Sequence, residues 1–216
     1  MLTRFDRTVS DGLDVLDDIA PVGLTHIGFK DVGVQPETLR ALHQRIKQMG
    51  ATSYLEVVST SIDTMLQSAR VAREIGVDRL LGGTEVDAVL EILAGSAVEY
   101  LPFPGRPFDH PTKLGGTAAD VELDCRRFRA AGCAGVDLLA YRATEADPIE
   151  LVKAARRGTD GVLLVAGGVG SPAQVKALAA AGADSFTVGS AAFDGSFAPH
   201  VGSLRSQLAA VLDACR

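Results

Sequence analysis

Residues 161–193 read GVLLVAGGVGSPAQVKALAAAGADSFTVGSAAF, and this stretch decides the fold class. A short aliphatic run leads into a glycine-rich turn, an alanine-rich helical segment follows, and a second short apolar run ends at another glycine. A strand, a helix and a strand in this order form a βαβ unit, in which the two strands lie parallel in one sheet. The stretch therefore predicts a parallel α/β fold with helices packed over the strands.

The same alternation continues through the whole chain of 216 residues. Short aliphatic or β-branched runs, expected to be strands, occupy residues 25–30, 53–58, 78–81, 98–101, 135–140, 161–165 and 185–188. Amphipathic segments, expected to be helices, occupy residues 9–19, 36–49, 61–75, 85–93, 118–131, 149–157, 172–181 and a last stretch that ends near 214. This order predicts a single (β/α)8 TIM barrel over residues 1–216, with an open doubly wound sheet as the alternative.

The first strand of this barrel is expected to be short. The helix over 9–19 needs a strand before it, and Met1–Phe5 is the stretch available for one. We expect Met1–Phe5 to pair between the strand that contains Lys30 and the strand that contains Val188, unless the first strand begins upstream of Met1. With these residues the strand count reaches eight, the number that closes a TIM barrel.

Composition narrows the classes of partner. The formal net charge of −6 disfavours nucleic acid and anionic membrane surfaces as main partners, because either would require a basic face. No apolar run approaches the roughly 20 residues that span a bilayer. The three cysteines form no CxxC pair, and their odd number fits a reducing compartment. We therefore expect a cytoplasmic protein, and the sequence leaves a homodimer open.

Two glycine-rich turns follow the last two expected strands. The first spans Gly167–Gly170 and the second begins at Gly189–Ser190. Glycine lets the backbone approach an anion closely and point N–H groups at it, and a following helix start adds partial positive charge. In TIM barrels, the loops after strands 7 and 8 often form a phosphate site. The two turns together predict phosphate binding, whereas one alone would read as a tight turn.

The run VLLVAGGVGSPAQVKALAAAGADSFTVGSAAF at residues 162–193 resembles the C-terminal quarter of the ribulose-phosphate-binding barrels. That superfamily includes phosphoribosyl isomerases, ribulose-phosphate 3-epimerase and the hexulose-phosphate synthase group. The resemblance implies phosphate contacts at Gly167, Gly168, Gly189 and Ser190. The chain lacks the DxKxxD motif of the synthase and decarboxylase group and the paired His and Asp strand ends of the epimerase, so no catalytic residue carries over.

Strand alternation selects three candidate catalytic residues. In the run HIGFK, Ile27 and Phe29 are apolar and should pack under helices, which leaves Lys30 pointing into the barrel. The same parity points Glu56 inward from the next strand and Asp137 inward from the expected sixth strand. Buried charges are costly unless they pair or meet a ligand. We expect Lys30, Glu56 and Asp137 to converge, either as an acid–base set or as a structural layer.

Three further residues are candidate substrate contacts. Arg4 follows the short first strand, Lys113 lies in a Pro/Gly-rich segment after the expected fifth strand, and Tyr141 follows the sixth. The Pro/Gly-rich segment, residues 102–116, is expected to be irregular and to act as a lid over the active face.

These features predict a cytoplasmic enzyme that acts on a small phosphorylated sugar or sugar acid. The reaction would be isomerisation, epimerisation or C–C cleavage, with Lys30 as electrophile or imine former and Glu56 or Asp137 as proton carrier. No nucleotide cofactor is expected, since no GxGxxG opens the first βα unit. A divalent metal held by Glu56 and Asp137 stays open but is not required. The alternative is a barrel that senses a phosphate ligand without catalysis, as glycerol-phosphate-responsive antiterminators do.

Overall fold

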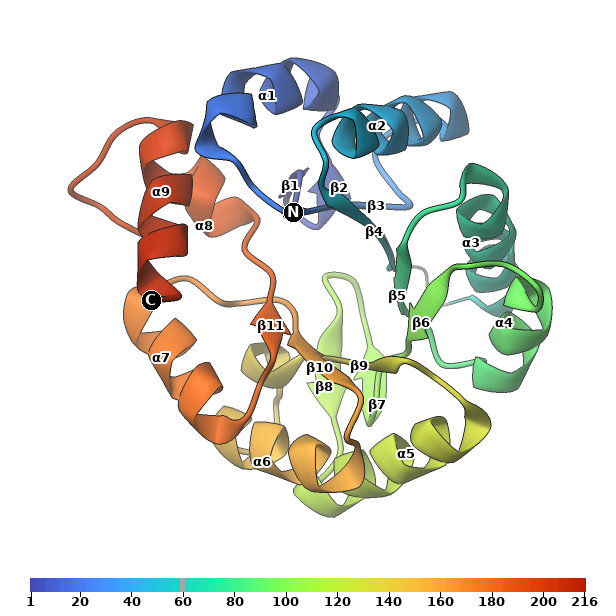
Figure 1. Ribbon diagram of the computed structural model, residues 1–216. Coiled ribbons are helices and arrows are strands. Elements are labelled where there is room, and N and C mark those ends of the chain that lie inside the picture. The colour runs from blue at the N-terminus through green and yellow to red at the C-terminus, as the bar shows by residue number, and fades with distance from the viewer. Residues whose placement is uncertain (59–60) are drawn as a thin grey trace.

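The computed structural model describes residues 1–58 and 61–216, and its strands form the inner wall of a barrel that is surrounded by helices (Figure 1). The strands of this wall are β3 (His26–Lys30), β4 (Thr52–Val57), β5 (Arg79–Gly82), β6 (Glu99–Leu101), β9 (Gly135–Leu138), β10 (Val162–Val165) and β11 (Ser185–Phe186). The helices around it are α1 (Gly12–Ile19), α2 (Pro36–Gln48), α3 (Ile62–Ile75), α4 (Val86–Leu93), α5 (Ala118–Ala131), α6 (Pro148–Gly158), α7 (Pro172–Ala181), α8 (Ser190–Phe193) and α9 (Leu204–Ala214). Short 3-10 helices cover Ala20–Val22 and Ala140–Arg142.

The wall consists of two parallel ladders, and a few backbone hydrogen bonds join them at two seams. One ladder has the order β3-β4-β5-β6 and the other the order β11-β10-β9. At the first seam, the Ala134 N–H donates to the Tyr100 carbonyl and the Asp137 N–H donates to the Pro102 carbonyl, both at 3.0 Å. Parallel strands joined through helices, in chain order around a ring, confirm the expected (β/α)8-type fold.

The N-terminal residues lie in the second seam, between β3 and the segment after β11. The Met1 nitrogen donates to the Val188 carbonyl at 2.8 Å, and the Leu2 N–H donates to the Gly28 carbonyl at 2.7 Å. The predicted pairing is thus confirmed for Met1 and Leu2. It is wrong for Thr3–Phe5, because the chain folds back there into an antiparallel hairpin of β1 (Thr3–Arg4) and β2 (Arg7–Thr8).

Most helices begin and end where local signals place them. Ser171 accepts a hydrogen bond from the Gln174 N–H as the N-cap of α7, and Pro172 occupies its first turn. The helix is capped at its C-terminus by Gly182, whose φ of 99° lies in the left-handed region that favours glycine. The inner faces of the helices cover the strands, so that Phe29, Leu55 and Leu138 are fully buried between the two layers.

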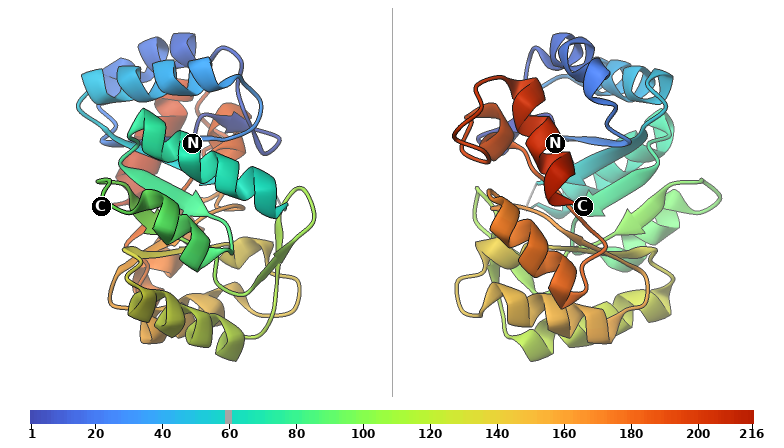
Figure 2. Two further views of the ribbon diagram at one scale, coloured as in Figure 1. Left: turned by 90° about the vertical axis from the view of Figure 1, so that its right-hand side faces the viewer. Right: turned by 60° about the vertical axis from the view of Figure 1, so that its left-hand side comes forward.

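The segment after β6 differs from its prediction. Residues 102–116 were expected to be irregular, but β7 (Arg106–Phe108) and β8 (Lys113–Gly115) form an antiparallel hairpin. Leu114 is buried and forms a bridge with Ala143, which follows β9, so the hairpin packs against the neighbouring loop. Figure 2 shows this hairpin projecting from one end of the barrel. Composition favoured a coil here, but strand pairing and the burial of Leu114 outweigh it.

Within the two ranges that the structure describes, no helix is long and apolar enough to cross a membrane.

Candidate active site

Lys30 and Glu56 lie side by side at the C-terminal ends of β3 and β4. The parallel register pairs the two residues directly, and the Lys30 Nζ lies 3.0 Å from Glu56 Oε1. Both side chains are almost fully buried, at 6 % and 4 % exposed. The inward parity expected for these two positions is therefore present, and it brings an ammonium and a carboxylate together inside the barrel.

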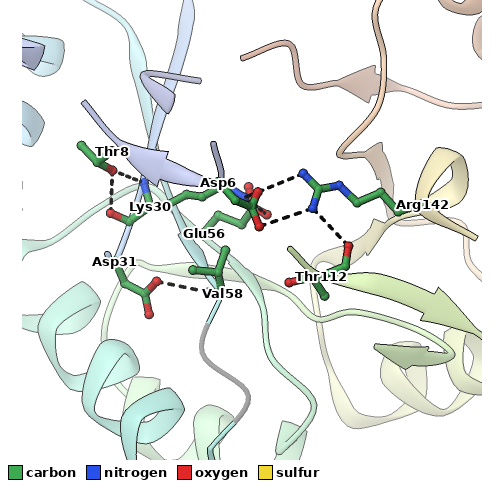
Figure 3. A network of polar contacts seen from close by, with 8 residues as sticks. All are labelled: Asp6, Thr8, Lys30, Asp31, Glu56, Val58, Thr112 and Arg142. Carbon is green, nitrogen blue, oxygen red and sulfur yellow. Dashed lines mark hydrogen bonds and ion pairs between the residues drawn. The ribbon is translucent and has the colours of Figure 1, made fainter. Parts of the chain in front are cut away.

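A second carboxylate, Asp6, meets Lys30 from the N-terminal hairpin (Figure 3). Asp6 Oδ1 lies 2.6 Å from the Lys30 Nζ. The Arg142 guanidinium donates to both oxygens of the same carboxylate, at 2.9 and 3.3 Å, and to the Thr112 carbonyl at 3.1 Å. Glu56, Lys30, Asp6 and Arg142 thus form a continuous chain of alternating charges across the end of the barrel.

These ion pairs determine the protonation states of Lys30 and Asp6. Burial alone would lower the pKa of Lys30, but the Glu56 and Asp6 carboxylates outweigh it and raise that pKa above its usual range. Burial would raise the pKa of Asp6, but Lys30 and Arg142 outweigh it and lower that pKa. At neutral pH, Lys30 is therefore an ammonium and Asp6 a carboxylate.

Asp137 lies in the barrel interior on β9 and is fully buried. Neither of its carboxyl oxygens has a hydrogen-bond partner within the described residues. Burial and the Glu56 charge raise the pKa of Asp137 well above its usual range, against the opposing effect of Lys30 and Arg142. The sequence expectation of a third inward carboxyl is met, but this group differs from Glu56 because it has no ion pair and its pKa is raised.

The backbone of Lys30 is fixed by Thr8 of β2. The Lys30 N–H donates to Thr8 Oγ1 at 2.7 Å, and the Thr8 hydroxyl donates to the Lys30 carbonyl at 2.8 Å. Next to it, Asp31 accepts a hydrogen bond from the Val58 N–H at 3.1 Å (Figure 3). These contacts hold the ends of β3 and β4 together, so the position of the ammonium is set by the wall of the barrel.

The charge chain and the two glycine turns line one cavity of about 310 Å³, which we call the mouth cavity. Gly167 and Gly168 have φ angles of 73° and 77°, where a side chain is strained. A Cβ at Gly167 would run into the Arg142 side chain, and one at Gly189 would run into Thr3. The turns are therefore glycine-rich for two reasons, backbone conformation and close approach of the neighbouring residues.

The predicted phosphate residues meet in the mouth cavity. It is lined by Gly167, Gly168, Gly189 and Ser190. Within the described residues, the N–H groups of Gly168, Gly189 and Ser190 donate to no protein acceptor. Ser190 is exposed and opens the short helix α8, whereas Ser171 is committed to capping α7. Free N–H groups from two adjacent turns can bind an anion.

The predicted substrate contacts lie outside this cavity. Arg4 is exposed and stacks over the Phe193 ring at 4.7 Å. Lys113 pairs with Asp109 at 3.2 Å on the β7–β8 hairpin. Tyr141 packs against Gly168 outside the cavity, whereas the next residue, Arg142, lines it. The structure thus brings together the catalytic and phosphate candidates, and it leaves these three outside the lining.

The described residues hold no group of three or more His, Cys, Asp or Glu side chains placed to bind a metal ion. Glu56 is engaged by Lys30, and Asp137 is enclosed beneath the cavity. The divalent metal that the sequence left open at Glu56 and Asp137 therefore stays a prediction.

The fold is similar to that of several solved structures. The chain superimposes on orotidine 5′-phosphate decarboxylase from Pyrococcus horikoshii OT3 with a TM-score of 0.60 and 19% identity, over 96% of both chains. It matches 3-hexulose-6-phosphate synthase with a TM-score of 0.64 and 16% identity, over 94% of this chain and 91% of the other. These matches show that the chain shares the (β/α)8-type fold of both proteins.

A third match is a chain of the Amycolatopsis orientalis BexX/CysO complex, with a TM-score of 0.64 and 19% identity over 96% of this chain and 84% of that one. No protein-family model matches the sequence. No curated protein matches it either. At these identities the structural likeness establishes the fold and leaves the reaction to be argued from the site.

Sequence reasoning missed Asp6 as a site residue. It sits in a hairpin turn where Phe5 and Asp6 have φ angles of 49° and 63°, and neither is the Gly or Asn that announces such a turn. Arg142 carried a weaker signal, since it follows the expected sixth strand on the active face. Asp6 reaches the cavity from a hairpin turn and Arg142 from the end of a 3-10 helix, and strand parity gives no direction for either.

Proposed function

We propose that this chain is a cytoplasmic enzyme that acts on a small phosphorylated sugar or sugar acid, by isomerisation, epimerisation or C–C bond cleavage. The observation that carries the proposal is the mouth cavity, in which a buried ammonium held by two carboxylates lies in the same space as two glycine turns with free N–H groups. Two solved structures of the same fold are named for phosphorylated compounds, orotidine 5′-phosphate and 3-hexulose 6-phosphate. Phosphate would bind at the turns, and the reacting carbons would extend toward Lys30.

Lys30 acts in this proposal as a permanent ammonium. Imine formation needs a neutral amine with a lowered pKa, whereas the two carboxylates beside Lys30 raise its pKa. A fixed ammonium stabilises negative charge that develops on a substrate oxygen, as in an enediolate. Reactions that pass through such an anion are the isomerisations and C–C cleavages named above.

The two inward carboxyls differ in their suitability for proton transfer. Glu56 lines the cavity and contacts Lys30, so it can take a proton from a substrate carbon that lies against the ammonium. Asp137 lies beneath the cavity and keeps its proton, since burial and the Glu56 charge raise its pKa. In our proposal Glu56 is the base, and Asp137 stays protonated beneath it.

The proposal is tested by a binding and turnover screen of phosphorylated three- to six-carbon sugars and sugar acids, each beside its unphosphorylated counterpart. We expect thermal stabilisation by the phosphorylated compounds alone, and exchange of a substrate C–H with solvent deuterium for at least one of them. The variant Glu56→Gln should bind that compound but abolish the exchange. Equal stabilisation by the unphosphorylated counterparts would contradict the phosphate site, and binding without any turnover or exchange would favour a sensor.

A further inference from the structure

The tip of the N-terminal hairpin is held in place by the Asp6 carboxylate. Its base is anchored, because Thr8 bonds to both backbone groups of Lys30 and the Thr8 N–H donates to the Val32 carbonyl at 2.9 Å. At the tip, Phe5 and Asp6 both have left-handed φ angles without being glycine. Phe5 is 87% exposed and so provides no anchoring burial. Besides the pairing of β1 with β2, the ion pairs of Asp6 with Lys30 and Arg142 hold this turn over the cavity.

Asp6 fills a binding position for a carboxylate. Its two oxygens face the guanidinium of Arg142, and one of them also faces the Lys30 ammonium. A planar guanidinium that donates to both oxygens of a carboxylate is the geometry by which arginine recognises such groups on ligands. The Arg142 side chain is 24% exposed and lines the mouth cavity, so a ligand there can reach it.

We propose that the substrate carries a carboxylate in addition to its phosphate, and that this carboxylate takes the place of Asp6 on Arg142. The inference rests on the proposed function and narrows its substrate class to phosphorylated acids. A carboxylate preserves the charge balance around Arg142 when Asp6 leaves, whereas a hydroxyl would leave the guanidinium without an anionic partner.

The exchange also prepares Lys30 for its role. When Asp6 leaves, the ammonium keeps Glu56 and frees the N–H that had pointed at Asp6 Oδ1. That N–H is then available to a substrate oxygen on which negative charge develops. Recognition of the acid group at Arg142 thus couples to exposure of the ammonium, and a phosphorylated compound without the acid group leaves Lys30 covered.

The test follows the hairpin tip by fluorescence. The chain contains no tryptophan, so Phe5→Trp places a single reporter at the exposed tip, and Leu123→Trp on α5, at a site 68% exposed, is the matched control. The probes are 3-phosphoglycerate and glycerol 3-phosphate, which share the phosphate and the three-carbon backbone and differ in the carboxylate. We expect 3-phosphoglycerate to lower the anisotropy of Trp at position 5 and to bind about tenfold more tightly than glycerol 3-phosphate. The control reporter should stay unchanged.

A charge variant gives an independent reading. Asp6→Asn removes the competing carboxylate. The affinity for 3-phosphoglycerate should then rise about tenfold, while the affinity for glycerol 3-phosphate should change less than about threefold. Asp194→Asn removes a charge from another wall of the same cavity, where Asp194 contacts Ser196, and should not discriminate between the probes. Equal affinities for the two probes, with no selective gain in Asp6→Asn, would overturn the inference and leave the proposed function standing. Failure of both probes and of inorganic phosphate to bind would overturn the proposed function itself.

Discussion

The two ends of the barrel carry cavities of opposite character. The one at the N-terminal ends of the strands, here the N-terminal cavity, measures about 580 Å³ and is lined largely by apolar side chains of α7, α9 and the adjoining strands. The mouth cavity at the other end measures about 310 Å³, and it contains Asp6, Lys30, Glu56 and Arg142. The smaller cavity is the candidate active site, because it is identified by its charged lining and not by its volume.

The difference has an energetic basis. The ionisable residues that are buried in the described part of the chain are Asp6, Lys30, Glu56 and Asp137. Lys30 pairs with Asp6 and Glu56, and the Glu56 charge acts on Asp137. Burying an ion costs several kcal/mol that pairing returns only in part. A fold that needed only stability would place apolar residues there, as it does around the N-terminal cavity. Perturbed titratable groups gathered in one cleft are typical of functional sites.

The largest effect is expected from the loss of Lys30. Lys30→Met should reduce turnover at least about a hundredfold, since the group that stabilises developing negative charge is removed. Val211→Ala in the N-terminal cavity should leave turnover within about twofold and cost roughly 1 kcal/mol of stability. Turnover is measured on the substrate found in the screen, together with thermal unfolding.

A second variant separates catalysis from folding. In Lys30→Met, Glu56 is left buried without a partner, so the protein should also lose stability. The double variant Lys30→Met/Glu56→Gln removes both charges and should recover most of that stability while turnover stays lost. Recovered turnover in the double variant would mean that the pair only holds the barrel together.

A smaller effect is expected at the glycine turns. Gly189→Ala places a Cβ against Thr3, so the turn must shift and its N–H groups move. We expect phosphate-ligand affinity to fall at least about tenfold, as for the loss of one or two charge-assisted hydrogen bonds. Gly202→Ala, where a Cβ meets nothing within 4 Å, is the control and should bind as the parent chain does. Affinity is measured by calorimetry. An unchanged value in Gly189→Ala would mean that the phosphate does not bind at this turn.

How far the sequence could predict this site depends on the element that carries each residue. Lys30, Glu56 and Asp137 lie on strands, whose two-residue period fixes the direction of each side chain, and all three point inward as expected. The glycine turns were recognisable because their composition follows from backbone conformation. Asp6 lies in a hairpin turn, Arg142 ends a 3-10 helix, and Arg4 and Lys113 lie on hairpin strands of two and three residues. Elements this short show no periodic pattern in the sequence, so the direction of these side chains depends on tertiary contacts.

The same distinction holds for the fold. The bounds of α5 and α7 match their predictions because a capping residue and a terminal glycine mark each helix. The hairpin of β7 and β8 was missed because its strands are three residues long and lie in a Pro/Gly-rich segment. Thr3–Phe5 was misassigned because the hairpin turn has no glycine, and the contact of Asp6 with Lys30 that stabilises it joins residues 24 apart in the sequence.

The smallest effect is expected in the pH dependence of stability, at Asp137. Its raised pKa means that the folded chain keeps a proton that the unfolded chain releases at about pH 3.9. The folded state then binds more protons than the unfolded state, so this residue makes the free energy of unfolding fall as the pH rises above about 4. Asp137→Asn has no such proton, and its stability relative to the parent should improve from pH 4 to pH 7.

Asp6 changes the free energy of unfolding with pH in the opposite direction. Its pKa is lowered, so it contributes stability above about pH 4 that is lost as the pH falls through its folded value. Asp6→Asn should therefore lose stability relative to the parent at neutral pH and approach it in acid. Denaturant unfolding at several pH values checks both variants, and parallel curves for the two would show that Asp137 is ionised in the folded protein.

The central claim is that the mouth end, and not the larger apolar end, binds phosphate. A crystal of the protein soaked with inorganic phosphate tests it most directly. We predict the anion within hydrogen-bond distance of the N–H groups of Gly168, Gly189 and Ser190, in the cavity that Lys30 lines. Phosphate bound elsewhere, with these N–H groups unoccupied or covered by side chains, would contradict the account.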